Sequence, residues 1–230
     1  MTVGGAARSR EDAKALRSRV SRATSAEEKA QCLDEIEVAL ATAKEPSEKA
    51  RILMCRAHLR ANQSEFPKVV ADAVTAMGLF EEAGEAEGAL EAASAASAYA
   101  SRLGELSLAS DLAAKCIVGL PTLTDDALRS DVTNRLGMFC ISFSDYDHAI
   151  EQLEESLAAA ERCRDQRFVY RELYNLADTL LLAAHFDNVA EMSPEAAGRR
   201  TSRLAHAERV LQRIAEEGNE ELAAWAGLRR

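Results

Sequence analysis

Histidine, cysteine and carboxylate side chains are the residues of this chain that could carry out catalysis or hold a metal. The sequence has four histidines and five cysteines, at His58, His148, His185 and His206 and at Cys32, Cys55, Cys116, Cys140 and Cys163. No two histidines have the His-x-x-x-His spacing, and no two cysteines the Cys-x-x-Cys spacing, that metal and redox sites use. The sequence therefore predicts no metal site and no cofactor, and it predicts that the cysteines are free thiols within helices.

Acidic residues occur in adjacent pairs, among them Glu81-Glu82 and Glu154-Glu155. Neighbouring positions on a helix point about 100° apart, so the two carboxylates of a pair do not converge on one substrate. Glycine-rich phosphate-binding motifs and the Gly-x-Ser-x-Gly nucleophile motif do not occur in the sequence. We therefore predict that the protein is not an enzyme. The enzymatic alternative requires acidic or histidine side chains that meet only in the folded chain.

The charge balance also restricts the partner. The chain of 230 residues carries a formal net charge of −10. A protein that binds nucleic acid directly normally presents a basic face, and an anionic membrane surface would repel this chain. No apolar run approaches the roughly 20 residues that span a bilayer, and residues 1–10 lack the apolar core of a secretory signal. The sequence predicts a cytoplasmic protein that contacts neither nucleic acid nor membrane.

A short pattern recurs every 40 residues: a small residue, a polar residue, a large apolar residue and, three positions later, a small apolar residue. It is found at Ser64-Glu65-Phe66 with Val69, Gly104-Glu105-Leu106 with Ala109, Ser144-Asp145-Tyr146 with Ala149, and Ala184-His185-Phe186 with Val189. Seven residues before each pattern is another small residue, at Ala57, Ser97, Gly137 and Ala177. A fixed period of about 20–50 residues is typical of helical-repeat arrays. We expect each pattern to be the corner of an antiparallel helical hairpin whose helices approach closely at the small residue.

The third unit resembles a tetratricopeptide repeat (TPR). The resemblance rests on Asn134-Arg135-Leu136-Gly137 in the first helix and on Asp145-Tyr146-Asp147-His148-Ala149-Ile150-Glu151 in the second. The other units are similar, but the family's first-helix Trp is absent from all four and the period is 40 rather than about 34. The resemblance implies an all-α fold, a right-handed superhelix, or solenoid, of antiparallel helical hairpins.

The order of these patterns predicts four parts. Residues 1–10 are expected to be disordered, and residues 11–45 to form a capping helical hairpin with a capping box at Ser25 and Glu28. Residues 46–192 hold the TPR-like repeats. Residues 193–230 are expected to form C-terminal helices, the first starting with Ser193 as its cap and Pro194 at its first position. We expect this part to lead into a downstream domain of a longer protein.

The first helices of TPR-like hairpins line a concave groove, and the resemblance carries this role over to particular positions. They include Asn, Arg, Tyr and Met, which suit peptide recognition through polar contacts and adaptable apolar ones. The predicted partner-binding residues are Arg51, Met54, His58, Arg102, Asn134, Arg135, Met138, Arg171, Tyr174 and Asn175.

These observations predict a non-catalytic scaffold module that binds a protein or peptide segment in its concave groove. An alternative, by analogy with similar arrays, is an N-terminal sensory or regulatory input domain of a larger bacterial signalling protein. Its output would be a diguanylate cyclase or a transcription regulator. A further alternative is a homodimer formed through the terminal helices, where the sole tryptophan, Trp225, is found.

Overall fold

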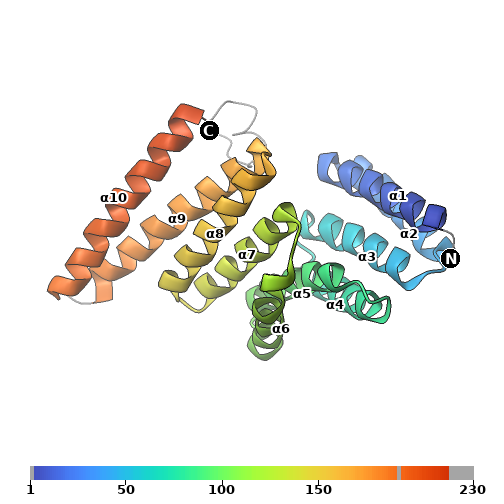
Figure 1. Cartoon of the computed structure of the whole chain (residues 1–230), viewed down its shortest axis with the longest axis horizontal. Coiled ribbons are helices and arrows are strands. Elements are labelled where there is room, and N and C mark those ends of the chain that lie inside the picture. The colour runs from blue at the N-terminus through green and yellow to red at the C-terminus, as the bar shows by residue number, and fades with distance from the viewer. Residues whose placement is uncertain (1–2, 191–192, 218–230) are drawn as a thin grey trace. The chain divides into compact units, whose positions relative to one another are not determined.

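The chain is built from helices. The computed structural model describes the backbone of residues 3–190 and 193–217, and the side chains of residues 12–187 and 193–217. All regular structure in these ranges is helical, which confirms the all-α prediction. By its internal contacts the chain divides into two compact units, Met1–Pro121 and Thr122–Arg230. Figure 1 shows the helices of both units, coloured along the chain.

Unit 1 consists of three successive helical hairpins. Its helices are α1 (Val3–Arg22), α2 (Ala26–Thr42), α3 (Pro46–Ala61), α4 (Phe66–Glu82), α5 (Ala86–Arg102) and α6 (Leu106–Gly119), followed by a short 3-10 helix, Leu120–Thr122. From α3 onward, each helix packs against the next. The first hairpin joins this stack through a core that includes Val20, Ile36 and Leu59, all fully buried.

Unit 2 consists of two hairpins. Its helices are α7 (Asp126–Ser142), α8 (Tyr146–Cys163), α9 (Gln166–Ala190) and α10 (Pro194–Glu217). They pack in chain order and lie alongside one another in Figure 1. Leucines of α8 and α9, including Leu153, Leu173, Leu176 and Leu180, form the core together with Ile214 of α10. The start of α10 agrees with the predicted cap, because the Ala196 amide donates to Ser193 Oγ at 3.1 Å.

The first helix begins earlier than the sequence analysis predicts. The sequence predicts disorder for residues 1–10, whereas α1 starts at Val3 and continues to Arg22. Ala6, Ala7 and Arg8 are strong helix formers. They extend a helix that Leu16 and Val20 anchor in the core.

Left-handed residues end several helices at intervals that are multiples of twenty. Positive φ angles occur at Ser64, Gly84, Gly104, Ser144 and Arg164. After each of the first four, the next amide donates to the carbonyl five positions earlier, as the Glu65 amide does to Arg60 O at 2.9 Å. The residue after each is acidic, and its charge favours the start of the next helix. Twenty residues therefore hold one helix and one turn, and two such steps make the 40-residue period.

The corner expected at residues 184–186 does not form, and this prediction is wrong. Instead α9 continues through these positions for 25 residues, where α7 has 17. The position held by a left-handed Ser or Gly at the other corners is Ala184 here. Alanine is the best helix former and adopts positive φ poorly, so nothing at this position ends the helix.

The small residues before the corners do allow close approach. A Cβ atom added to Gly137 would lie 2.9 Å from Leu153 Cγ and 3.3 Å from the Ala149 carbonyl oxygen. At the equivalent position of unit 1, Ser97 Oγ donates to the Ala109 carbonyl at 2.8 Å. Both contacts join the first helix of a hairpin to the second, as the sequence pattern predicts.

Two glycine substitutions test the role of the left-handed turns. Gly104 has a φ of +77° and Gly78 is within α4, and neither has an atom within 4 Å of an added Cβ. We expect Gly104→Ala to lower the free energy of unfolding by about 1 kcal/mol, because alanine is strained at positive φ. The control Gly78→Ala should raise it by about 0.5–1 kcal/mol. Urea unfolding of both variants measures the signs, and a stabilising Gly104→Ala would contradict the assignment.

Candidate binding face

Two predicted groove residues of α3 are engaged within unit 1. Arg51 forms an ion pair with Glu85, and its guanidinium carbon lies 5.9 Å from the centre of the Phe80 ring. Met54 is only 9% exposed. These side chains contribute to the packing of unit 1 and leave little surface for a partner.

Arg102, the predicted residue on α5, is at the surface against two aromatic rings. Its guanidinium carbon lies 5.7 Å from the centre of the Phe66 ring and 5.6 Å from that of Tyr99. The two rings are themselves 5.4 Å apart. Cation–π contacts of this exposed kind are worth on the order of 0.5–1 kcal/mol each, so Arg102 is ordered by its own unit.

The first helix lies beside the predicted groove positions of α3. Cys55 Sγ is 3.5 Å from the Ala13 carbonyl oxygen, and His58 Nε2 is 3.4 Å from Ser21 Oγ. Burial raises the pKa of the Cys55 thiol to about 11, so this thiol is protonated and unreactive at neutral pH. The α1 helix therefore contributes to this face, which the sequence analysis did not foresee.

An ion pair extends across the same face from α1 to α5. Arg17 Nη1 donates to Glu91 Oε1 at 2.5 Å, although the two residues are 74 positions apart. Both charges act on the Cys55 thiol of α3, so the pair spans the middle helix of the three. No motif marks Arg17 in the sequence, and this contact could not be predicted from the repeat pattern.

In unit 2, two predicted residues meet on a buried glutamate. Glu172 is 0% exposed. Arg171 Nε donates to its Oε1 at 2.5 Å, and the Asn134 side-chain amide donates to its Oε2. Arg171 also forms an ion pair of 2.8 Å with Asp131. Asn134 and Arg171 thus join α7 to α9 from within.

Burial controls the protonation of this glutamate. Loss of hydration raises the pKa of Glu172 above its ordinary value of 4.5, and the Arg171 charge and the Asn134 hydrogen bond oppose the shift. Glu172 is not among the predicted residues, because those are helix positions expected to face a groove. In the sequence Glu172 stands between Arg171 and Leu173, and no motif marks it as buried.

The remaining predicted residues of unit 2 are near the surface. Asp131 of α7 contacts Arg171 of α9. Arg135 and Asn175 each come four residues later, one turn further along the same two helices, so they lie beside each other. Met138 follows on α7. Tyr174 is half-buried, with its hydroxyl 3.3 Å from that of Tyr170.

Two further residues of α9 lie on the same side of this helix as Asn175. Leu182 is seven positions after Asn175, so it lies on the same side of the helix with Asp178 between them. Asp178 is exposed and Leu182 is 39% exposed. We call the following set the α7/α9 face: Arg135, Met138, Tyr174, Asn175, Asp178 and Leu182.

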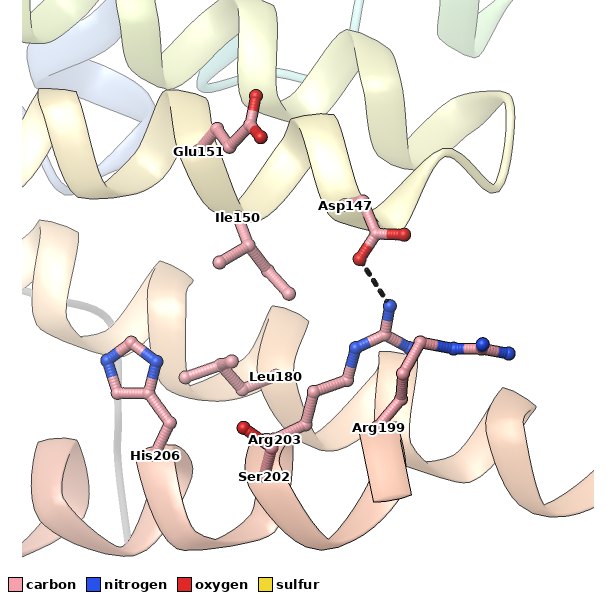
Figure 2. Close-up of a pocket in the computed structure, with 8 residues that line it drawn as sticks. All are labelled: Asp147, Ile150, Glu151, Leu180, Arg199, Ser202, Arg203 and His206. Atoms are coloured by element: carbon pink, nitrogen blue, oxygen red, sulfur yellow. Dashed lines mark hydrogen bonds and ion pairs between the residues drawn. The ribbon is translucent and has the colours of Figure 1, made fainter. Parts of the chain in front are cut away.

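A separate pocket of about 350 Å³ lies among α8, α9 and α10. In Figure 2, Ile150 points into it toward Leu180, and Arg203 reaches across to Asp147. Arg203 donates to Asp147 at 2.6 Å, to Asp187 at 2.5 Å and to the Ala183 carbonyl at 3.2 Å. Through these bonds the guanidinium of Arg203 holds α10 on α8 and α9. We therefore read this pocket as a junction between helices.

Two further properties concern the described part of the chain. None of its groups of His, Cys, Asp and Glu is arranged to hold a metal ion. None of its helices has the length and apolar character needed to cross a membrane.

Similarity to known proteins is found among solved structures. Neither a protein-family model nor a curated protein sequence matches the chain. Among solved structures, BtubC (BKLC) from P. vanneervenii is 18% identical with a TM-score of 0.55, and the match covers 94% of this chain and 91% of BtubC. A variant of a putative kinesin light chain from Podosopora anserina, described as having nearly identical TPR-like repeats, is 13% identical with a TM-score of 0.59. That match covers 91% of this chain and 95% of the other.

The chain has a TPR-like fold. A second structure of the putative kinesin light chain from Podosopora anserina is 13% identical with a TM-score of 0.55, and the match covers 91% of this chain and 94% of the other. The expected TPR-like array of antiparallel helical hairpins is thereby confirmed. At these identities the likeness concerns the fold alone, and the predicted groove residues stay a prediction.

The buried glutamate gives a pH-dependent prediction. With its pKa raised in the folded chain, Glu172 binds a proton more tightly when folded than when unfolded. Its contribution to stability is therefore full below pH 4.5 and is lost as the pH rises through the folded pKa. The free energy of unfolding of the wild type relative to Glu172→Gln should fall as the pH increases above about 4.5. Urea unfolding at several pH values measures this difference, and a constant difference would contradict the raised pKa.

Proposed function

We propose that the protein is a non-catalytic scaffold that binds a protein segment on the α7/α9 face. The observation that supports this most is that the predicted residues of unit 2 fall into a buried group and a partly exposed group. Asn134 and Arg171 bond to Glu172 inside the unit, whereas Met138, Tyr174 and Asn175 remain partly exposed. A fixed base beneath a row of partly exposed side chains suits recognition, because a preorganised base loses less conformational entropy on binding.

The side chains of this face suit an extended segment with an apolar anchor. Asn175 offers both donors and acceptors to a main chain. Met138 and Leu182 offer apolar surface, and methionine adapts to partners of different shape. Arg135 and Asp178 have opposite charges, so the face does not select a strongly acidic or basic ligand. A partner with one large apolar residue and free main-chain amides fits this chemistry.

Unit 1 is the weaker candidate for this role. The Arg17–Glu91 ion pair runs from α1 across α3 to α5, and Arg51 forms an ion pair with Glu85. A ligand on this side would have to compete with these pairs. For this reason the proposal places Asn175 and its neighbours at the centre and leaves Arg51, Met54 and His58 with structural roles.

The fold supports a role in protein binding, and binding on the α7/α9 face is our proposal. Helical-repeat arrays present extended surfaces that suit protein binding, and function must be argued from the site. The alternative of a regulatory input domain in a signalling protein stays a prediction.

Selection from a displayed random-peptide library tests the proposed face. Peptides that bind the full chain should lose at least about tenfold in affinity, or 1.4 kcal/mol, with the triple variant Met138→Ala, Asn175→Ala, Leu182→Ala. All three side chains are at least partly exposed, so circular dichroism should show an unchanged fold.

A matched control uses exposed apolar residues of unit 1. Leu106 and Ile117 are 47% and 59% exposed, and the variant Leu106→Ala, Ile117→Ala should bind the selected peptides as the wild type does. Equal loss in the control and the triple variant would refute the α7/α9 face as the site. A library that yields no binder would count against a peptide-binding function.

A further inference from the structure

A pocket of about 630 Å³ lies among α1, α2 and α3 of unit 1, and it shares no residue with the α7/α9 face. Its lining includes Asp12, Leu16 and Arg19 of α1 and Glu35, Val38 and Thr42 of α2. Residues three or four positions apart lie on one side of a helix, so each of the two helices contributes one continuous stripe. We call the space lined by these two stripes the α1/α2 groove.

The base of the α1/α2 groove is apolar. Leu16 of α1 and Ile52 of α3 both line it, are each only 5% exposed, and belong to the core that joins the first hairpin to α3. Val38 of α2 also lines the groove and is 66% exposed. Among the described large apolar side chains only Val118 is more exposed. An apolar side chain placed in the groove would remove this surface from water, which favours binding.

Acidic side chains dominate the charge of the groove. Four carboxylates line it, at Asp12, Asp34, Glu35 and Glu48. Among the described residues of the lining the one base is Arg19, which forms an ion pair of 2.7 Å with Glu35. The groove therefore combines an apolar base with an excess of negative charge.

We propose that the α1/α2 groove binds a basic amphipathic helix of a partner protein, at a site separate from the α7/α9 face. Each stripe covers about two helical turns, or roughly 10 Å, so two turns of a bound helix fit along it. Large apolar residues of that helix, three or four positions apart, contact Leu16, Val38 and Ile52. Its lysines and arginines face Asp12 and Asp34, and this complementarity selects a basic partner over a neutral or acidic one.

The charge of the whole chain argues against a second copy as the occupant. The formal net charge is −10, so two copies repel each other, whereas a basic partner is attracted by the same field. The α7/α9 face makes no such selection, because Arg135 and Asp178 have opposite charges. The two sites therefore differ in the class of partner that each binds.

Selection on a variant that lacks the first site tests this proposal. A displayed random-peptide library is selected on the full chain carrying Met138→Ala, Asn175→Ala and Leu182→Ala, so that the α7/α9 face does not contribute. We expect peptides with a net positive charge and with large apolar residues three or four positions apart. Their affinity should fall severalfold between about 50 and 500 mM salt, because salt screens exposed charges.

Two matched variants in the same background locate the binding. Asp34→Asn, Val38→Ala should weaken the selected peptides at least about tenfold, because it removes a carboxylate and apolar surface of the groove. The control Asp111→Asn, Ile117→Ala alters an exposed aspartate and an isoleucine that is 59% exposed on α6, and it should bind them unchanged. All four side chains are exposed, so circular dichroism should show the same helix content in both variants. If the groove variant loses helix content, Asp34→Lys alone replaces it and should show the same loss of affinity.

Three results would overturn the proposal: a library that yields no binder, binders without a net positive charge, or equal affinity for the groove variant and the control. A dimer in light scattering that the groove variant dissolves would mean that a second copy fills the groove. Basic peptides that bind this background are set aside when the α7/α9 face is tested. Failure of this selection therefore leaves the proposed function standing, and failure of the α7/α9 test leaves the groove proposal standing.

Discussion

The left-handed turn is the constraint on which the rest of the structure depends. A residue with positive φ ends the helix at Ser64, Gly84, Gly104, Ser144 and Arg164, and an acidic residue after it starts the next. With helix length fixed in this way, small residues such as Gly137 recur where two helices cross. The spacing of turns thus decides which side chains of consecutive hairpins come to the same level.

One predicted turn is missing, because Ala184 does not end α9 and the helix continues to Ala190. The residues of the α7/α9 face come before this extension, with Leu182 beside Asp178 on α9. Beneath this face, Glu172 joins α7 and α9 through Arg171 and Asn134. An exposed row over a buried polar contact gives unit 2 a surface that unit 1, with its Arg17–Glu91 pair, does not have.

Much of the fold could be predicted from the sequence, because it rests on local patterns. The corners at Ser64, Gly104 and Ser144 form with a positive φ at these residues, and these predictions are confirmed. Ala184 fits the same sequence pattern, but alanine favours a helix, so the corner predicted there does not form. The candidate site was harder to predict, since Arg17 with Glu91 and Asn134 with Glu172 meet over long sequence separations. Periodicity places a residue on a face, but it does not reveal whether that side chain is bonded to its neighbours.

Hydrogen exchange of the full chain, with and without a library-selected peptide, tests the location of the binding face most directly. Backbone amides of residues 135–142 and 174–185 should exchange more slowly in the complex, because binding to α7 and α9 suppresses their local opening. The amides of α8 and α10 and of unit 1 should be unchanged. Slowing confined to α8 and α10, or to unit 1, would contradict the assignment of the α7/α9 face.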